Sequence, residues 1–246
     1  MEARNRQTRI LFLGNSLVYY NDMPGTLEAL ALAAGKNVFV DSVTKGSATM
    51  AQFADRSTEI GAAAYAKLTQ SAWDFVIAEP SRRITPEEDS VLAAETAAAK
   101  VLKELAGAAG AELLFYDVFG NNDGKPGIFR MTAGPAAEKT GFFLMSRQEH
   151  TAFLHRVNLR ISREVGGVRL IPAGLAFEEA LRDAPDIGLY HTDNRHPSPE
   201  GSYLAACLVF NVLFGEKTAG IRYDGGLPFA SVLREIADRL PELQGP

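Results

Sequence analysis

A serine at the end of a buried strand is the first residue in this sequence that could do chemistry. The run Ile10–Leu13 is apolar throughout, as expected of a strand covered on both faces. Gly14 ends that run and permits a tight turn, and Ser16 follows two residues later. Because sites in open α/β sheets form outside the carboxyl ends of the strands, we interpret Ser16 as a candidate nucleophile.

A candidate base for this serine lies near the other end of the sequence. His196 lies in a polar loop just before a predicted helix, and Asp193 precedes it by three residues. A carboxylate at that spacing can accept a hydrogen bond from Nδ1 of the ring, which leaves Nε2 free to take a proton. The pattern predicts a triad in which Ser16 attacks, His196 is the base and Asp193 orients the ring.

Acyl transfer also needs donors for the oxyanion of a tetrahedral intermediate. The loop Thr44–Thr49 follows a predicted strand that should neighbour the first one. We therefore expect the backbone N–H of Ser16, together with that of Gly46 or Ser47, to serve as donors.

The same residues allow other interpretations. Ser16 could cap a turn, and His191, Asp193 and His196 are types that bind metals, but one short loop gives them an awkward geometry and no fourth ligand is evident. We expect no metal and no organic cofactor. His150 and His155 are five apart on a predicted helix, which does not place them on one face, so surface or structural roles are expected.

Five stretches read as strands and alternate with helices. The strands are predicted at Ile10–Leu13, Val38–Val43, Trp73–Pro80, Ala111–Val118 and Val168–Ile171. Helices are predicted at Leu27–Ala34, Thr58–Gln70, Pro86–Ala106, Arg147–Val165, Ala173–Arg182 and Ala230–Leu240. A further helix is predicted to start at Ser198–Pro199, with the serine as its cap, and is apolar nearly all round over Tyr203–Phe214. This alternation predicts a three-layer α/β/α fold with a mainly parallel five-stranded sheet, in a single domain over 1–246. The aperiodic segment Gly120–Ser146 is predicted to be a loop that forms a lid or a pocket wall.

Composition narrows the class of protein. The chain has 246 residues, 46% of them hydrophobic, and a formal net charge of -5, which argues against nucleic-acid or membrane partners. Cys207 is the single cysteine, so an internal disulfide is excluded. The segment Met1–Arg9 lacks the apolar run of a signal peptide, so a cytoplasmic protein is expected. The sequence does not indicate an oligomeric state.

Two sequence blocks resemble those of the SGNH (GDSL-like) hydrolases. Gly14–Leu17 is similar to their first block, and Asp193–Ser198 is similar to their final Asp-x-x-His block. Further landmarks that look like one branch of this superfamily are Tyr19–Pro24, Asp74–Ile77, Pro172–Phe177 and Gly201–Ala206. The resemblance implies a flavodoxin-like fold and ester hydrolysis through an acyl-enzyme on Ser16. It also implies oxyanion donors from the serine N–H, a glycine N–H and an asparagine side chain.

The expected asparagine of the third block is not visible, and the third predicted strand ends in Glu79 instead. An ionised glutamate only accepts hydrogen bonds and would repel an oxyanion. Glu79 is therefore protonated, turned away, or replaced by a donor such as Ser81, Asn121 or Asn122. We place Asn15 and Glu79 in the wall of the site.

The sequence thus predicts a serine esterase that acts on a small-molecule ester, with an acetylated carbohydrate as one candidate substrate. The alternative is a non-catalytic protein that keeps the fold and binds a sugar or another small molecule in the crevice. A nucleotide or phosphate binder that uses the turn at Gly14 is a weaker third hypothesis.

Overall fold

The computed structural model describes residues 6–84, 89–122, 127–130, 140–143 and 145–240. Its main sheet has five parallel strands in the order β2-β1-β3-β4-β7. These strands are β1 (Thr8–Gly14), β2 (Val38–Thr44), β3 (Phe75–Ala78), β4 (Glu112–Tyr116) and β7 (Arg169–Ile171). The predicted three-layer fold around a parallel five-stranded sheet is confirmed.

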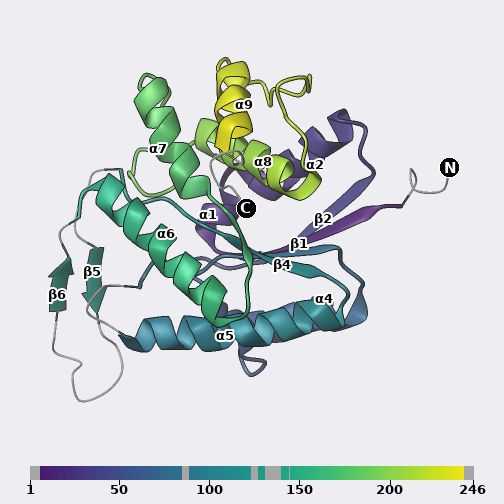
Figure 1. Cartoon of the computed structure of the whole chain (residues 1–246), viewed down its shortest axis with the longest axis vertical. Helices are drawn as coiled ribbons and strands as arrows, with labels where there is room; N and C mark the ends of the chain where they lie inside the picture. Colours follow the sequence, from purple (N-terminus) through teal and green to yellow (C-terminus); the bar gives the residue numbers. More distant parts are fainter. Residues whose placement is uncertain (1–5, 85–88, 123–126, 131–139, 144, 241–246) are drawn as a thin grey trace.

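Helices cover both faces of this sheet (Figure 1). One face is covered by α2 (Met23–Ala33), α7 (Ala173–Asp183), α8 (Pro199–Phe214) and α9 (Ala230–Arg239). The other face is covered by α3 (Met50–Ala54), α4 (Glu59–Gln70), α5 (Asp89–Ala108) and most of α6 (Arg147–Glu164). Two apolar cores result, one on each side of the strands.

The central strand β1 contributes to both cores. Ile10 and Phe12 pack into the core beneath α2 and α8, whereas Leu11 and Leu13 pack into the core above α3 and α5. All four side chains are fully buried. Successive side chains of a strand point to opposite faces, so a strand covered on both sides must be apolar at every position. This is the physical reason for the continuous apolar run in the sequence.

The strand order reverses at β1: β2 pairs with one edge of β1, and β3 pairs with its other edge. Gly14 pairs with Thr44 of β2, and Leu13 pairs with Ala78 of β3. The carboxyl ends of the three strands are therefore level. The loops that follow them meet at one edge, which is where ligands bind in open α/β sheets.

Several sequence predictions need correction. The segment after Thr49 begins a short helix, α3, which Thr49 caps through its side chain, and the sequence analysis did not predict it. The interval 120–146 is not a loop throughout, because β5 (Gly127–Arg130) and β6 (Thr140–Phe143) pair as an antiparallel hairpin. The predicted helix start at Pro86 lies outside the described residues.

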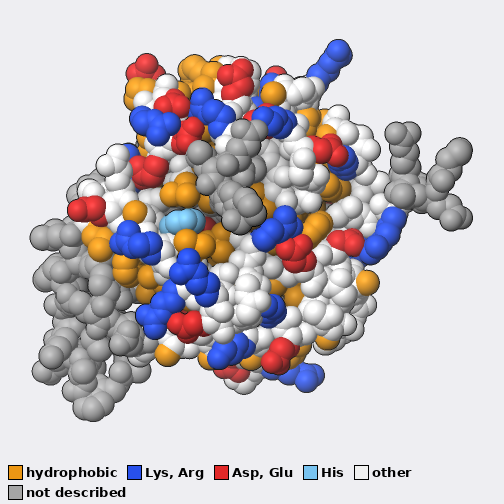
Figure 2. Space-filling model, in the orientation of Figure 1, with side chains coloured by type: hydrophobic (Ala, Val, Ile, Leu, Met, Phe, Trp, Pro, Cys, Tyr) orange, Lys and Arg blue, Asp and Glu red, His pale blue; other side chains and the backbone are white. Residues whose placement is uncertain are grey.

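Lys, Arg, Asp and Glu side chains are spread over the face drawn in Figure 2, and hydrophobic side chains occur between them in small patches. Within the described ranges, none of the helices combines the length and apolar character needed to cross a bilayer.

Gly201 allows α8 to pack closely against the chain that leads into the loop of His196. A Cβ at this position would lie 2.3 Å from the carbonyl oxygen of Leu189 and 2.8 Å from Cζ of Phe177. We expect Gly201→Ala to lower the free energy of unfolding by about 1–3 kcal/mol, because the clash exceeds the gain in helix propensity. Urea unfolding measures this change.

Gly107 provides the matched control, since it is also helical and a Cβ there would meet nothing within 4 Å. We expect Gly107→Ala to leave stability the same or to raise it by up to about 1 kcal/mol. Equal stabilities for the two variants would contradict the close packing at Gly201.

Candidate active site

Ser16 is the first residue of the short helix α1 (Ser16–Tyr19), directly beyond β1. Asn15 caps this helix, because its Oδ1 accepts a hydrogen bond from the N–H of Leu17 at 3.0 Å. Leu17 and Val18 are buried and anchor α1 to the core. The serine side chain is thereby held at the rim of the sheet edge described above.

Glu79 holds the other side of Asn15. Its Oε2 accepts the backbone N–H of Asn15 at 3.0 Å, and its Oε1 accepts from Asn15 Nδ2 at 2.6 Å. The carboxyl group is almost completely buried, and burial raises its pKa to about 7 against the opposing effect of the hydrogen bonds from Asn15. Of the three alternatives for Glu79, the geometry favours the one in which it is turned away, beneath the nucleophile turn.

A closed loop presents His196. The N–H of His191 donates to the carbonyl oxygen of His196 at 2.8 Å, and Asn194 takes a left-handed conformation with φ of 58° inside the loop. Oδ1 of Asp193 accepts the N–H groups of Arg195 at 2.9 Å and of His196 at 3.0 Å. Such bonds from an aspartate to the backbone just after it are a standard way to fix a turn.

The structure brings Ser16, His196 and Asp193 together, although the serine and the histidine are 180 residues apart in sequence. Ser16 Oγ lies 2.8 Å from His196 Nε2, and His196 Nδ1 lies 2.5 Å from Asp193 Oδ2. Partial burial acts to raise the pKa of Asp193, but hydrogen bonds from His196 and Arg195 outweigh it and hold this pKa well below its usual range. Asp193 is thus a charged acceptor for the ring.

Tyr20 and Asn21 connect α1 to this loop. The ring of Tyr20 stacks on the imidazole of His196, with centroids 4.0 Å apart and planes 7° from parallel. Nδ2 of Asn21 donates to the carbonyl oxygen of Pro197 and to Oγ of Ser202, both at 2.9 Å. Asn21 and Asp22 both have positive φ, a conformation that asparagine and aspartate tolerate better than most residues.

The backbone N–H groups of Ser16, Gly46 and Ser47 have no acceptor among the described residues. The turn that contains Gly46 and Ser47 is closed by the N–H of Ala48, which donates to the carbonyl oxygen of Lys45. Ser47 has φ of 61° and lines the same cavity as Ser16, whereas Gly46 is not among the residues that line it. Of the two alternatives at this turn, Ser47 is therefore nearer to the site.

The cavity at Ser16 has a volume of about 240 Å³. Its described lining consists of Asn15, Ser16, Leu17, Ser47, Ala48, Ser81, Arg82, Arg83, Asn121, His150, Arg195 and His196. Two of the side-chain donors proposed in place of Glu79, Ser81 and Asn121, therefore face the space in front of Ser16. The amide oxygen of Asn121 is buried and has no partner among the described residues, and an amide can present either its oxygen or its nitrogen to a ligand.

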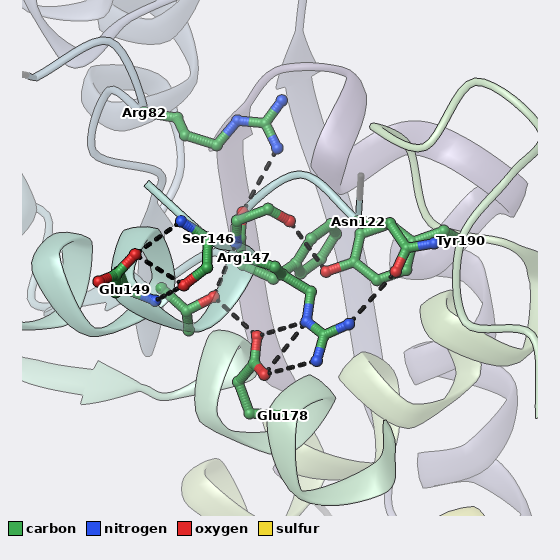
Figure 3. Close-up of polar contacts among 10 residues, drawn as sticks. Arg82, Asn122, Ser146, Arg147, Glu149, Glu178 and Tyr190 are labelled. Carbon is green, nitrogen blue, oxygen red and sulfur yellow. Dashed lines mark hydrogen bonds and ion pairs between the residues drawn. The ribbon is translucent and has the colours of Figure 1, made fainter. Parts of the chain in front are cut away.

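Asn122, the third proposed donor, has a structural role instead. Its Nδ2 donates to Oδ1 of Asn194 at 3.1 Å, and its own Oδ1 accepts from Arg147 (Figure 3). Arg147 in turn forms an ion pair with Glu178 of α7 at 3.0 Å. This network ties the segment after β4 to the loop that carries His196.

Three further residues form hydrogen bonds to the backbone of the same segment. Tyr190 Oη donates to the carbonyl oxygen of Gly120 at 2.9 Å, and Arg82 Nη1 donates to that of Phe119 at 3.3 Å (Figure 3). The N–H of Gly120 donates to Oγ1 of Thr151 at 2.9 Å. The wall of the cavity formed by residues 119–122 is thus fixed by hydrogen bonds to three other elements.

His150 corrects a sequence prediction. It was expected to be a surface or structural residue, but it lines the cavity from the start of α6. Burial and, to a smaller extent, the charge of Arg82 together lower its pKa to about 4. His150 is therefore neutral at neutral pH. No local signal in the sequence distinguishes it, because its position depends on how α6 packs.

Sequence reasoning also missed Tyr20 and the arginines of the cavity. Arg82 and Arg83 directly follow the third strand, a position that could have marked them, while Arg195 stands inside the Asp-x-x-His block itself. A second histidine–carboxylate pair, between His155 Nδ1 and Asp117 Oδ2 at 2.6 Å, is formed away from the cavity. Among the residues described, no group of three or more His, Cys, Asp and Glu is arranged to hold a metal ion.

Comparison with known proteins finds similarity among solved structures only. No protein-family model matches the sequence, and no curated protein sequence matches it. Among solved structures, it is similar to a candidate SGNH hydrolase from Slackia heliotrinireducens, with 28% identity over 85% of this chain and all of that one, and a TM-score of 0.62.

Two more distant structures share the fold. A DUF4886 family protein from Bacteroides uniformis is 15% identical, covers 97% of this chain and 95% of its own, and has a TM-score of 0.72. The psychrotrophic esterase EstA from a Pseudoalteromonas species is 15% identical over 85% of this chain and 97% of its own, with a TM-score of 0.53. The resemblance to the SGNH (GDSL-like) hydrolases is thus confirmed: the two distant structures share the fold, and the similarity to the candidate SGNH hydrolase supports a hydrolase.

Burial of Glu79 makes the stability of the protein depend on pH. Its folded pKa of about 7 exceeds the ordinary value of 4.5, so its contribution is fully present below the ordinary pKa and is lost as pH rises through about 7. The unfolding free energy of the wild type should therefore fall between about pH 5 and about pH 8. In Glu79→Gln we expect this fall to be smaller, by up to about 3 kcal/mol. Urea unfolding at both pH values measures this difference.

Burial also raises the pKa of Glu95 to about 7. Because Glu95 still titrates in Glu79→Gln, part of the decrease in unfolding free energy remains in that variant. The exposed Glu235 provides the control, and Glu235→Gln should follow the wild type. Identical pH profiles for the wild type and Glu79→Gln would show that Glu79 is ionised throughout this range.

The stacking of Tyr20 on His196 should affect turnover. Aromatic pairs contribute roughly 0.5–1.5 kcal/mol beyond the burial of area, so Tyr20→Ala should lower kcat/KM by about threefold to tenfold. Tyr20→Phe preserves the ring and should retain the wild-type value. Steady-state kinetics with an ester substrate provide the test, and an equal loss in both variants would assign the effect to the hydroxyl group instead.

Proposed function

We propose that this protein is a serine ester hydrolase of the SGNH type that forms an acyl-enzyme on Ser16. The observation that carries this proposal is the unbroken chain of hydrogen bonds from Ser16 Oγ through His196 to Asp193. A serine hydroxyl is a weak nucleophile until a base removes its proton, and a base is most effective when a third group fixes its orientation. The three residues have that relation.

The first half-reaction follows from the geometry. Ser16 Oγ attacks the ester carbonyl carbon while His196 Nε2, 2.8 Å away, accepts its proton. Asp193, held in its charged form, stabilises the imidazolium that results. When the tetrahedral intermediate collapses, the carbon–oxygen bond to the alcohol breaks and His196 returns the proton to the leaving oxygen.

The oxyanion is stabilised by preorganised donors in this proposal. The N–H groups of Ser16 and Ser47 have no acceptor among the described residues and can point at the developing charge. Ser81 or Asn121 supplies a side-chain donor in place of the asparagine that the family resemblance implies. Each such donor typically contributes roughly 2.7–4 kcal/mol to transition-state stabilisation.

The second half-reaction releases the acyl group. A water molecule gives a proton to His196 as its oxygen attacks the acyl carbon, and the bond to Ser16 Oγ breaks as the hydroxyl recovers its proton. The cavity of about 240 Å³ lies below the usual range of roughly 300–1,000 Å³ for ligand pockets. Its size favours a short acyl group, and an acetylated carbohydrate remains one candidate substrate.

Loss of the nucleophile should abolish ester turnover. We expect Ser16→Ala to lower kcat/KM on a chain-length series of para-nitrophenyl esters by at least about a thousandfold, with activity of the wild type greatest on acetate. Ser231→Ala, at an exposed serine of α9, is the matched control and should keep wild-type activity. Unchanged ester turnover in Ser16→Ala would overturn the assignment.

A fluorophosphonate probe separates this function from that of a non-catalytic binding protein. Only a serine activated by a base reacts readily with such a probe. Covalent labelling of the wild type, absent in Ser16→Ala and in His196→Gln, is the expected result by mass spectrometry. A wild type that resists labelling and hydrolyses no ester would favour the binding protein.

A further inference from the structure

We propose that the ester substrate carries an anionic group, of which a carboxylate is the simplest, and that an arginine cluster in the cavity binds it. This cluster consists of Arg82, Arg83 and Arg195. The inference rests on the proposed function, because it names the class of ester that the site would accept. It does not follow from the overall composition, since the whole chain has a net charge of -5.

The first argument is the charge of the lining. Three arginines line the cavity at Ser16, and none of the described residues that line it is acidic. The side chains between them that can bond to a ligand include Ser47, Ser81 and Asn121, which are neutral. Clefts with walls of one charge concentrate ligands of the opposite charge, so this cavity favours an anion.

The second argument is the environment of Arg82. Burial lowers its pKa, the nearby charge of Arg195 lowers it further, and the negative charges of Glu79 and Asp193 only partly compensate. Its guanidinium makes one hydrogen bond to the described residues, to the carbonyl oxygen of Phe119 at 3.3 Å. Arg82 is partly buried, and its guanidinium has five N–H donors, most of which have no partner among the described residues. An anionic ligand would supply that partner.

The third argument is that the nearby carboxylates are already engaged. Both oxygens of Glu79 accept hydrogen bonds from Asn15, and the oxygens of Asp193 accept from the backbone and ring of His196 and from the N–H of Arg195. Within the described part of the chain, no carboxylate lies within 4.0 Å of a guanidinium nitrogen of the arginine cluster. The positive charge is therefore available to a ligand.

The placement of the cluster fits recognition of a substrate next to the reacting bond. Arg82 and Arg83 follow β3, and Arg195 directly precedes His196. The two sets approach the cavity from different elements, so an anion bound between them would lie beside the ester that Ser16 attacks. Arginine suits this role because its planar group can bond to both oxygens of a carboxylate at once.

The experiment compares esters that differ in one charge. For an anion on the alcohol half, the pair is para-acetoxybenzoate and its methyl ester. For an anion on the acyl half, the pair is the para-nitrophenyl half-ester of glutarate and para-nitrophenyl butyrate. Each pair is measured with the wild type, Arg83→Gln, Arg195→Gln and Arg222→Gln, an exposed arginine that does not line the cavity.

The readout is the ratio of kcat/KM for the charged ester to that for the neutral ester. We expect this ratio to fall by about tenfold to a hundredfold in Arg83→Gln and Arg195→Gln for one of the two pairs, and to stay at the wild-type value in Arg222→Gln. Comparing ratios cancels the intrinsic reactivity of the esters. Added salt should lower the wild-type ratio, since it screens the attraction. Equal ratios in all four proteins would overturn the proposal.

An equilibrium arm separates this proposal from the proposed function. Calorimetry with Ser16→Ala compares para-hydroxybenzoate with para-hydroxybenzamide, and glutarate with its neutral diamide, in the presence and absence of the Arg83→Gln change. Selective binding of the anions without ester turnover by the wild type would uphold the anion site and overturn the esterase. Ester turnover with no preference for anions would overturn the anion site and leave the esterase standing.

Discussion

The hydrogen bonds between Asn15 and Glu79 fix the position of the candidate nucleophile, Ser16, relative to the rest of the site. Asn15 caps α1 with one atom of its amide and donates to the carboxyl group with the other. Glu79 is itself fixed, because its backbone N–H donates to the carbonyl oxygen of Leu13 in β1. Two neighbouring strands and the helix that presents Ser16 are thus joined at one buried point. A polar residue in this position is acceptable because both of its oxygens are satisfied.

The sequence was most informative where one local pattern determines a structure. The apolar run Ile10–Leu13 and the turn at Gly14 predict a doubly covered strand, and the side chain of Ser198 with Pro199 predicts the start of α8. The spacing of Asp193 and His196 is equally local, because three residues of loop suffice to bring a carboxylate to Nδ1. For this reason the pairing of Asp193 with His196, and the strand and helix named above, could be predicted without knowledge of any long-range contact.

Features that depend on distant packing could not be derived in this way. His150 reaches the cavity through the placement of α6, and Asn122 is drawn to Asn194 by contacts that span 72 residues. The strands β5 and β6 contain strand-forming residues such as Ile128 and Phe142, but each strand has only four residues, and so short a run gives too little periodicity to predict a strand. Glu79 is the most instructive case, since its sequence position suggested a conflict with an oxyanion, and only the three-dimensional arrangement reveals its bonds to Asn15.

The bonds from Asn21 to Pro197 and Ser202 have a consequence for biosynthesis. Ser16 and Asn21 leave the ribosome early, but the partners that order them are translated about 180 residues later. Until α8 emerges, α2 can pack against β2 but lacks the helix that completes the core around Leu27 and Leu30. The nascent chain therefore exposes apolar surface that a chaperone can recognise, and the candidate site matures only after the segment with His196 and Ser202 has been translated.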